Sequence, residues 1–426
     1  MKISYSQDRA ILLYVVYFAV FVDAIFGALT LANYDFIKLS LVYRLVILIT
    51  FVVLIFKTNN FFSNYIKLIL LLWVGSLFNL ASTGRIAELF LDIQIFVKVL
   101  FPFAVFFILY HQFKHKDYCL MICKGLSLFG FVAGILFLFS ILTGIGFQNY
   151  SADLFGISSF FFAGNDIGIA LVLSLCFSWF LFLTTPNKYY FFAILFTSLA
   201  LVLLGTRTGI LGAAIVDTIY ISIFLFRKYP NRYFHKSMLF QKLIISVFLS
   251  VILFFIISFV LENLDMFSLQ LERFGDVAEG HNPRAILIEQ GMKYINQRPL
   301  IEGLLGSGTY YQLELAKGLM STVQGTLDFH TYRASFEHDI YDIHALYGKG
   351  LGGVILLAHW FFLLFSIVLF IKNRCLFSLT LSISLGLVFI IGNLSGHGIT
   401  SAQVGTLLGS IYFLNCTYKR GFFEKH

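Results

Sequence analysis

Long apolar stretches alternate with short polar segments along most of the chain. A helix needs about 20 apolar residues to cross roughly 30 Å of hydrocarbon, and about twelve segments approach that length. They lie at approximately 10–31, 39–56, 66–82, 89–110, 118–142, 167–183, 190–204, 209–226, 243–261, 352–371, 376–391 and 399–414. The pattern predicts an all-α polytopic membrane protein with about twelve transmembrane helices.

One long polar segment, 262–351, interrupts this pattern; it is mildly acidic and rich in Gly, His and Tyr. A connection of that length is usually functional. Asn282 and Pro283 suit the start of one helix within it, and a second helix is predicted from Ser335 to about Tyr347, where glycines end it. The chain therefore divides into helices at 1–261, a large, partly helical loop at 262–351, and further helices with the C-terminus at 352–426.

The composition excludes a soluble globular protein. Of the 426 residues, 59% are apolar or aromatic and only 12% are charged, against about a quarter in soluble domains. The mean hydropathy is +0.87. The five cysteines have no metal-ligand spacing, and none lies in the polar loop, so neither a zinc site nor a disulfide framework is predicted.

Lysine and arginine collect in alternate connections between the apolar stretches, which accounts for the net charge of +8 without a nucleic-acid partner. The cations lie near 2–9, 57, 114–116, 188, 227–242, 372–374 and 419–425. The positive-inside rule therefore predicts that both termini are cytoplasmic and that the polar loop lies outside the cytoplasm. An even number of spans agrees with this orientation.

Several ionisable residues fall inside the apolar stretches, where each must face a cavity or a partner. They are Asp23, Arg44, Lys98, Arg207 and Asp217. For Asp23 and Asp217, pairing with a neighbour or snorkelling near a span end explains the charge as well as a functional role does. Arg207 lies in LLLGTRTGILGA, where glycines allow close approach and a helix N-terminus adds positive potential. It is a candidate anion-binding residue, with a headgroup anchor as the alternative.

Arg284 is a second candidate for the same anion. It falls in the first turn of the helix that begins at Asn282, so its guanidinium and the free backbone N–H groups can face one ligand. Two arginines suit a pyrophosphate. Arg273 and Arg298 compete for this role.

The segment SFEHDIYDIHALYGKGLGG contains candidates for proton transfer. His338 and Asp342 are four residues apart and share a helical face, so the carboxylate can orient the imidazole as a base. Glu337 and Asp339 are alternative bases, or the acidic start of an exposed helix. A metal site is not favoured, because the spacing matches no ligand motif.

Two further segments carry polar residues at the ends of apolar stretches. GNLSGHGITSA contains His397, and AGNDIGIAL contains Asn165 and Asp166. All three are candidates for lining one cavity, although polar residues and glycines are also an ordinary way to end a membrane helix.

The order of these motifs resembles the O-antigen polymerase and O-antigen ligase superfamily over about the C-terminal half of the chain. The family pattern reads approximately Ser-Arg-x-Gly, then Pro-Leu-x-Gly-x-Gly, then His-Asn-x-Tyr-Leu followed by Gly-x-x-Gly. Here Thr206 replaces the Ser, Glu302 expands the glycine segment, and Asp339 stands where Asn is common.

The resemblance implies a bacterial inner-membrane glycosyltransferase that takes a glycan from undecaprenyl pyrophosphate on the periplasmic side, without a metal or another cofactor. Arg207 and Arg284 match the family's pyrophosphate-binding arginines, and His338 matches its catalytic histidine. The Phe-rich spans favour a polymerase; an O-antigen ligase that acts on lipid A core is the alternative. The alternative outside the glycosyltransferases is a flippase or other transporter of lipid-linked oligosaccharides. Expected partners are the lipid-linked oligosaccharide, membrane lipid and a chain-length regulator protein.

Overall fold

The computed structural model describes residues 5–34, 39–82, 84–114, 118–148, 156–162, 164–185, 187–226, 288–289, 292–293, 295–320, 336, 338–394 and 397–417. Its first half contains α1 (Tyr5–Leu12), the π-helical turn η1 (Leu13–Tyr17), α2 (Ala19–Leu31), α3 (Leu39–Lys57), α4 (Phe61–Ser82), α5 (Ile86–Phe113) and α6 (Cys119–Thr143). The short strands β1 (Phe147–Gln148) and β2 (Ile157–Ser159) pair antiparallel. Then follow α7 (Gly164–Thr184), α8 (Tyr189–Leu203), α9 (Arg207–Phe226), α13 (Leu300–Leu305), α14 (Tyr310–Met320), α15 (Asp339–Asn373), α16 (Leu376–Leu394) and α17 (Ala402–Thr417).

The predicted helical membrane architecture is confirmed. Within the described residues, 8 helices are long and apolar enough to cross a membrane, or 9 if the first bent pair counts as one span. That pair, Asp8–Tyr17 and Ala19–Leu31, bends by 47° at the π-helical turn. Every predicted span inside the described ranges contains a helix, and α8 and α17 have the predicted lengths of 15 and 16 residues, which are short of the roughly 20 that a full span needs. The predicted span 243–261 lies outside the described residues, so the count of twelve stays a prediction.

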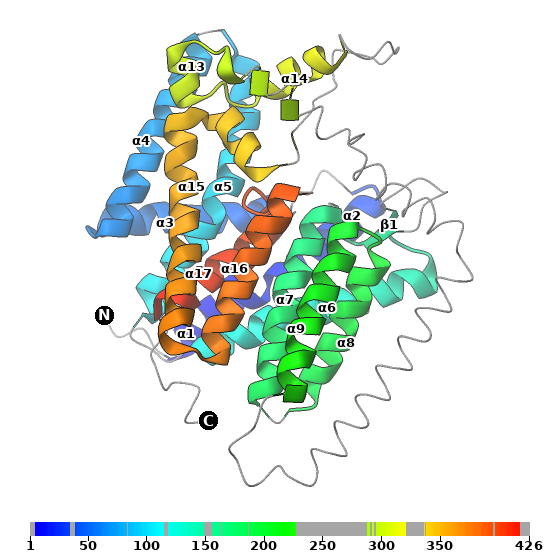
Figure 1. Ribbon diagram of the computed structural model, residues 1–426. Coiled ribbons are helices and arrows are strands. Elements are labelled where there is room, and N and C mark those ends of the chain that lie inside the picture. The colour runs from blue at the N-terminus through cyan, green and yellow to red at the C-terminus, as the bar shows by residue number, and fades with distance from the viewer. Residues whose placement is uncertain are drawn as a thin grey trace.

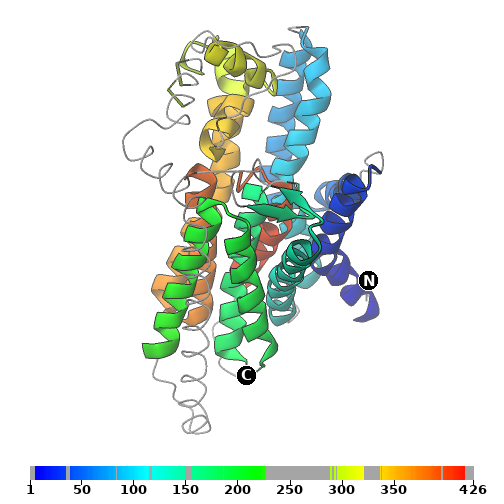
Figure 2. The same cartoon turned by 90° about the vertical axis from the view of Figure 1, so that its right-hand side faces the viewer.

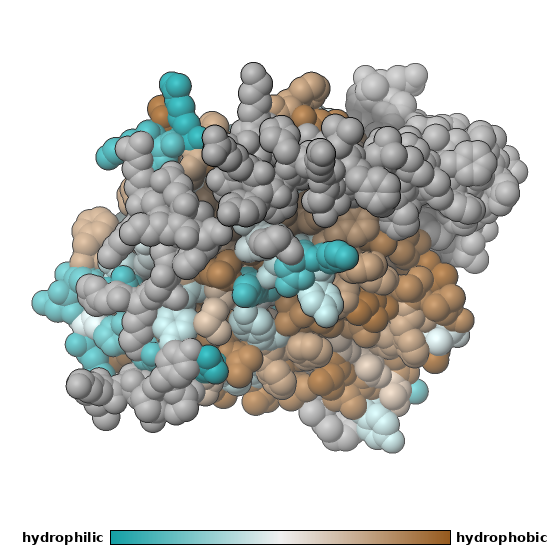
Figure 3. All heavy atoms as spheres, turned by 90° about the horizontal axis from the view of Figure 1, so that it is seen from below, coloured by the Kyte–Doolittle hydropathy of each residue, from teal (hydrophilic) through white to brown (hydrophobic). Residues whose placement is uncertain are grey.

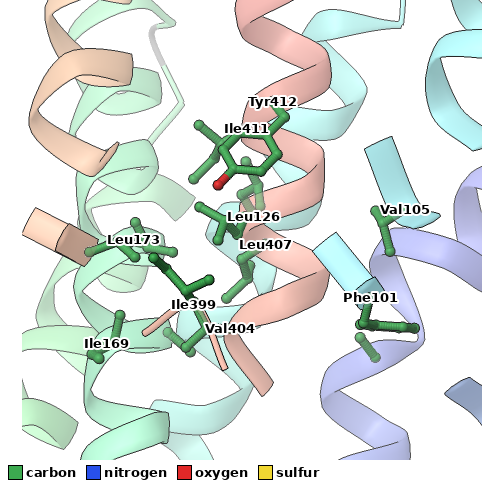
Figure 4. Close-up of a cluster of buried hydrophobic side chains, with 14 of the residues drawn as sticks. Phe101, Val105, Leu126, Ile169, Leu173, Ile399, Val404, Leu407, Ile411 and Tyr412 are labelled. Atoms are coloured by element: carbon green, nitrogen blue, oxygen red, sulfur yellow. The ribbon is translucent and has the colours of Figure 1, made fainter. Parts of the chain in front are cut away.

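The helices form two groups that meet at α7, α16 and α17 (Figure 1). Helices α6–α9 stand together on one side, and α3, α4, α5 and α15 on the other. The membrane segment of α7 is 83% buried and that of α4 is 22% buried, so α7 lies inside the bundle and α4 at its surface. Side chains from α5, α6, α7 and α17, with Ile399, fill the core between the groups (Figure 4).

Two pairs of glycines allow the closest helix contacts. A Cβ at Gly130 of α6 would lie 2.5 Å from Thr197 Oγ1 of α8, and one at Gly134 would lie 2.4 Å from the Phe196 carbonyl oxygen. Gly405 and Gly409 of α17 pack in the same way on Phe101 and Pro102 of α5. Glycines four residues apart are a common helix-packing device in lipid, where small residues let backbones approach.

The outer surface is apolar, as lipid contact requires. Large side chains such as Phe78 and Phe90 are 74% and 75% exposed. Seen from below, hydrophobic residues cover much of the face on the side of α6–α9 (Figure 3). Contiguous apolar surface on this scale marks a membrane-facing protein.

Helices α13 and α14 cover the end of the bundle where α4, α5 and α15 project (Figures 1 and 2). Gly306 (φ 82°) and Gly348 (φ 67°) have left-handed backbones and meet without side chains between them. A Cβ at Gly306 would lie 2.0 Å from the carbonyl oxygen of Leu346, and one at Gly348 would lie 2.6 Å from the nitrogen of Gly306. The glycine-rich motifs of the loop are therefore backbone contact surfaces.

The predicted helix at Ser335–Tyr347 is corrected at its start only. The helix begins at Asp339, because His338 has extended backbone angles (φ −149°, ψ 109°) and occupies the N-cap. Its predicted end agrees with the structure, since Gly348 has non-helical angles (φ 67°, ψ −179°) and breaks α15 at a kink. Beyond the kink, α15 continues as a membrane segment to Asn373.

Candidate functional site

The first turns of four helices, α7, α9, α15 and α17, converge at the end of the bundle that carries α13 and α14 (Figure 2). We call this group the N-terminal cluster. The buried carboxylate of Asp339 joins α15 to the segment before α17. Asp166 on α7 accepts a hydrogen bond from Ser401, which precedes α17. A Cβ at Gly168 of α7 would lie 3.7 Å from Thr206 Oγ1, at the start of α9.

The GTRTG motif forms the start of α9, and its residue types suit a capped and tightly packed helix start. Thr206 caps the helix, since its Oγ1 accepts a hydrogen bond from the backbone N–H of Gly209 at 3.1 Å. A Cβ at Gly209 would lie 2.8 Å from that oxygen and 3.1 Å from the Leu201 carbonyl, so the turn has no space for a side chain. Arg207 is the first residue of α9, at its positive end. Its side chain lies outside what the structure describes.

Asp342 is a carboxylate of the cluster that accepts three hydrogen bonds. Its Oδ1 accepts hydrogen bonds from the hydroxyl of Tyr311 (2.5 Å) and the backbone N–H of Phe336 (2.9 Å). Its Oδ2 accepts one from the backbone N–H of His338 (3.0 Å) and lies 3.7 Å from Nδ1 of His397. Asp342 was expected to hold the imidazole of His338, but it holds the backbone of that residue instead.

His338 has a half-buried ring that packs against Tyr341 with 4.3 Å between ring centroids. Among the described residues, its buried Nδ1 has no hydrogen-bond partner. Burial lowers the pKa of His338 from its usual value of 6.5, and the neighbouring Asp342 opposes this in part. The ring is therefore neutral at neutral pH, the state in which an imidazole accepts a proton.

Asp339 is completely buried and bonds to the segment before α17. Its Oδ2 accepts the backbone N–H groups of Gly398 and Ile399, both at 2.9 Å, and its Oδ1 accepts the hydroxyl of Thr400 at 3.1 Å. A Cβ at Gly392 would lie 2.1 Å from Oδ2, so only a glycine at this position leaves room for the carboxylate. With these bonds made, Asp339 ties α15 to α17 and is poorly placed to serve as a base.

The three candidate cavity residues occupy different parts of the cluster. His397 interacts electrostatically with Asp166 and approaches Asp342. Asp166 is in the first turn of α7, and Asn165 precedes it, also half-buried. His397 and Asp166 are therefore neighbours, although they are separated by more than two hundred residues in sequence, and the cavity that they were expected to line stays a prediction.

Three of the sequence candidates, Arg273, Arg284 and Glu337, lie outside the described residues. Arg298, the other competitor of Arg284, donates from Nη1 to the carbonyl oxygen of Ala345 at 2.8 Å. Burial lowers the pKa of Arg298 to about 10, with Glu302 opposing, so it stays protonated at neutral pH. Arg298 thus holds the first turns of α15 and is engaged in structure.

Three of the other charged residues at membrane depth, Asp23, Arg44 and Asp217, have bonding partners. Arg44 donates to both carboxylate oxygens of Asp23, at 2.8 and 3.0 Å. Asp217 accepts hydrogen bonds from Nε1 of Trp179 (2.6 Å) and the hydroxyl of Ser198 (2.9 Å). For these three residues the pairing interpretation is the correct one.

Two functional contacts had no signal of their own in the sequence. Tyr311 reaches Asp342 from α14, and burial raises its pKa, so the hydroxyl remains a donor. The side chain of Asn393 accepts the backbone N–H of Ile340 at 3.1 Å. Their positions beside GSGT and GNLSG were the only hints. Within the described part of the chain, no group of three or more His, Cys, Asp or Glu residues could hold a metal ion.

Comparison with protein families matches residues 191–331 to the O-antigen ligase family. These residues belong to that family. The matched segment runs from α8 through the cap of α9 and the α13–α14 region, and it ends just before His338. The predicted relation to the O-antigen polymerase and ligase superfamily is thereby confirmed.

The family match gives the protein its broad function. Its members are glycosyltransferase-like enzymes that act in membranes on lipid-linked oligosaccharides during O-antigen biosynthesis. The apolar helices agree with a multi-pass membrane protein of this kind. Comparison with curated proteins finds no match.

Proposed function

We propose that the protein is an O-antigen polymerase. It transfers a glycan from undecaprenyl pyrophosphate to the terminal sugar hydroxyl of another lipid-linked repeat, on the periplasmic side of the bacterial inner membrane. The observation that supports this proposal is the N-terminal cluster, in which the start of α7 contacts both the cap of α9 and the segment of His397, and His397 approaches the start of α15.

The chemistry of the cluster suits a pyrophosphate leaving group. Helix N-termini present free N–H groups and positive potential, which stabilise anions. Arg207 and Arg284 neutralise the charge that develops as the glycosidic bond to the pyrophosphate breaks. His338 takes the proton from the attacking hydroxyl as the new bond forms. Loss of one such charge contact costs about 100- to 1000-fold in rate.

A deletion strain tests the polymerase. Its lipopolysaccharide should carry one repeat on the core in place of a ladder of chain lengths. A core without any repeat would refute the polymerase and favour a ligase or flippase. The ligase is the second candidate because the matched family is described as O-antigen ligase.

The orientation is proposed from the charge distribution. With both termini cytoplasmic, 262–351 is periplasmic, and a cysteine introduced at Ser321 should react with an impermeant maleimide in intact spheroplasts. A cysteine introduced at Lys57, in a predicted cytoplasmic connection, is the matched control and should react only after permeabilisation. The reverse result would overturn the orientation and the site built on it.

The pyrophosphate chemistry is proposed to need no metal. Purified protein should therefore keep its transfer rate in EDTA. A loss of activity that magnesium restores would refute the metal-free mechanism.

A further inference from the structure

A groove with a volume of about 480 Å³ lies among α1, η1, α3 and α5. Val15, Ile47 and Ile108 line it and are only 3%, 1% and 5% exposed, so they form a fixed apolar floor. Apolar ligand sites in proteins commonly have this size and this kind of lining. The remaining apolar residues that line the groove are Ala10, Ile11, Val46 and Leu54.

One end of the groove is polar and carries positive charge. His111 and Gln112 line this end, at the close of α5. Gln112 donates from Nε2 to Oδ1 of Asp8 at 2.6 Å, which brings the end of α5 to the start of α1. The exposed side chains of Arg9 and Lys114 therefore lie at the same end, whereas Asp8 is buried. The charge that this end presents to a ligand is positive.

The groove opens on the membrane-facing surface of α3. Val46, on its rim, is 46% exposed, and Ile49 on the same helix is 57% exposed. Hydrocarbon tails surround such a surface in a bilayer, and the apolar floor gains stability when a tail covers it. A phosphate at the polar end accepts hydrogen bonds from lysine and histidine side chains. A free phosphate would leave the floor uncovered, and an uncharged hydrocarbon would make no use of the cations.

The groove is separate from the N-terminal cluster. Lys98 of α5 interacts electrostatically with Asp166 in that cluster. His111 lies 13 residues further along the same helix, which is about 20 Å at the rise of an α-helix. One pyrophosphate cannot reach both places, so the ligand of the groove differs from the donor proposed for the cluster.

We propose that this groove binds one anionic phospholipid, with an acyl chain along α3 and the phosphate at His111 and Lys114. The inference does not depend on the reaction that the protein catalyses. The lipid contacts α1, η1, α3 and α5 together, and it therefore stabilises the junction at the bent first helix pair.

Native mass spectrometry of the full-length protein, titrated with dioleoyl-phosphatidylglycerol, measures the dissociation constant of the first bound lipid. Dioleoyl-phosphatidylcholine has the same chains without the net charge and should bind more weakly. Thr50 is exposed and lines the groove. Thr50→Trp should weaken both lipids about tenfold, as expected if the indole displaces about two methylene groups of the chain. Lys114→Gln should weaken phosphatidylglycerol about fivefold and leave phosphatidylcholine unchanged.

Each variant has a matched control. Val53 is a 47% exposed residue of α3 that lies outside the groove, so Val53→Trp should bind both lipids as the wild type does. Lys188 is an exposed cation before α8, and Lys188→Gln should also match the wild type. If Thr50→Trp does not fold, Lys114→Gln decides the question, because its side chain is exposed.

Four results would overturn the inference. Equal affinity of the wild type for the two lipids would remove the anionic headgroup from the site, and an unchanged affinity in Thr50→Trp would remove the chain from the groove. Displacement of phosphatidylglycerol by an equal concentration of glycerol 3-phosphate would reduce the site to an anion site. Displacement by a lower concentration of a polyprenyl pyrophosphate would assign the groove to the donor.

Discussion

Two neighbouring aspartates should respond differently to the same isosteric change. Asp342→Asn and Asp339→Asn each remove one negative charge and keep the shape of the side chain. At Asp342 the two oxygens face different backbone donors, since Oδ1 accepts from Phe336 and Oδ2 from His338. At Asp339 both backbone donors, Gly398 and Ile399, bind the same oxygen.

The expected difference between the two variants follows from the asparagine amide, which has an oxygen that accepts hydrogen bonds and an NH₂ group that donates them. In Asp339→Asn, the amide oxygen can keep both backbone bonds while the NH₂ group donates to the hydroxyl of Thr400. In Asp342→Asn, either orientation sets the NH₂ group against a backbone N–H, so one buried donor loses its bond. Losing a charge-assisted bond costs about 1.5–3 kcal/mol, or about 10- to 150-fold in the fraction of protein with His338 held at the N-cap.

Transfer assays and thermal unfolding of the purified protein measure the difference. Asp342→Asn should lower the unfolding midpoint and reduce the transfer rate about tenfold or more. Asp339→Asn should keep its midpoint near the wild-type value and lose less than about fivefold in rate, because only the charge contribution of each bond is lost. Equal damage in both variants, or a harmless Asp342→Asn, would refute the hydrogen-bond geometry on which this reasoning depends.

The remaining predictions concern the glycine contacts, the anion site and the base. Gly306→Ala should strongly destabilise the protein, since its Cβ would lie 2.0 Å from a backbone oxygen, whereas Gly303→Ala in the same helix, with nothing within 4 Å, should be neutral or slightly stabilising in thermal unfolding. Arg207→Lys should reduce polymer length and transfer by about 100-fold or more at normal protein level, because a lysine cannot grip two phosphate oxygens at once. If Arg207→Lys still makes polymer of full length, Arg207 is a headgroup anchor and not a phosphate-binding residue. Since the neutral imidazole accepts the proton and burial lowers the pKa of His338 below 6.5, the transfer rate should fall on acidification with its midpoint below pH 6.5. A midpoint above pH 6.5 would exclude His338 as the base.

The membrane architecture could be predicted because span length and hydropathy follow from the thickness of the bilayer. The sequence pattern did not reveal how the helices pair. Gly130 and Gly134, and likewise Gly405 and Gly409, have the spacing of a packing motif, but spacing alone names no partner helix. The bend between η1 and α2 was also missed, because a π-helical turn leaves no hydropathic trace.

The sequence indicated the candidate residues one motif at a time, but not how the motifs meet. It paired His338 with Asp342 and, separately, His397 with Asn165 and Asp166, whereas the structure also brings His397 to 3.7 Å from Asp342. The spacing of His338 and Asp342 predicted a contact between carboxylate and ring, since four residues make one helical turn. That argument requires both residues to be inside the helix, and His338 is its extended N-cap.

The cluster also explains why short motifs so far apart in the chain share polar residues and glycines. Each one lies at a helix start at the same end of the bundle: Thr206 caps α9, His338 occupies the N-cap position of α15, and Gly398 and Ile399 precede α17 while bound to Asp339. A helix start needs a capping side chain and often a glycine for close packing, so these residues are required for structure before any substrate binds. Most residues of such a motif therefore begin the helix or pack it against its neighbours. Only the few side chains that remain exposed can contact a substrate. Asp339 serves the structure in this way: it is completely buried, and its two oxygens accept hydrogen bonds from Gly398, Ile399 and Thr400.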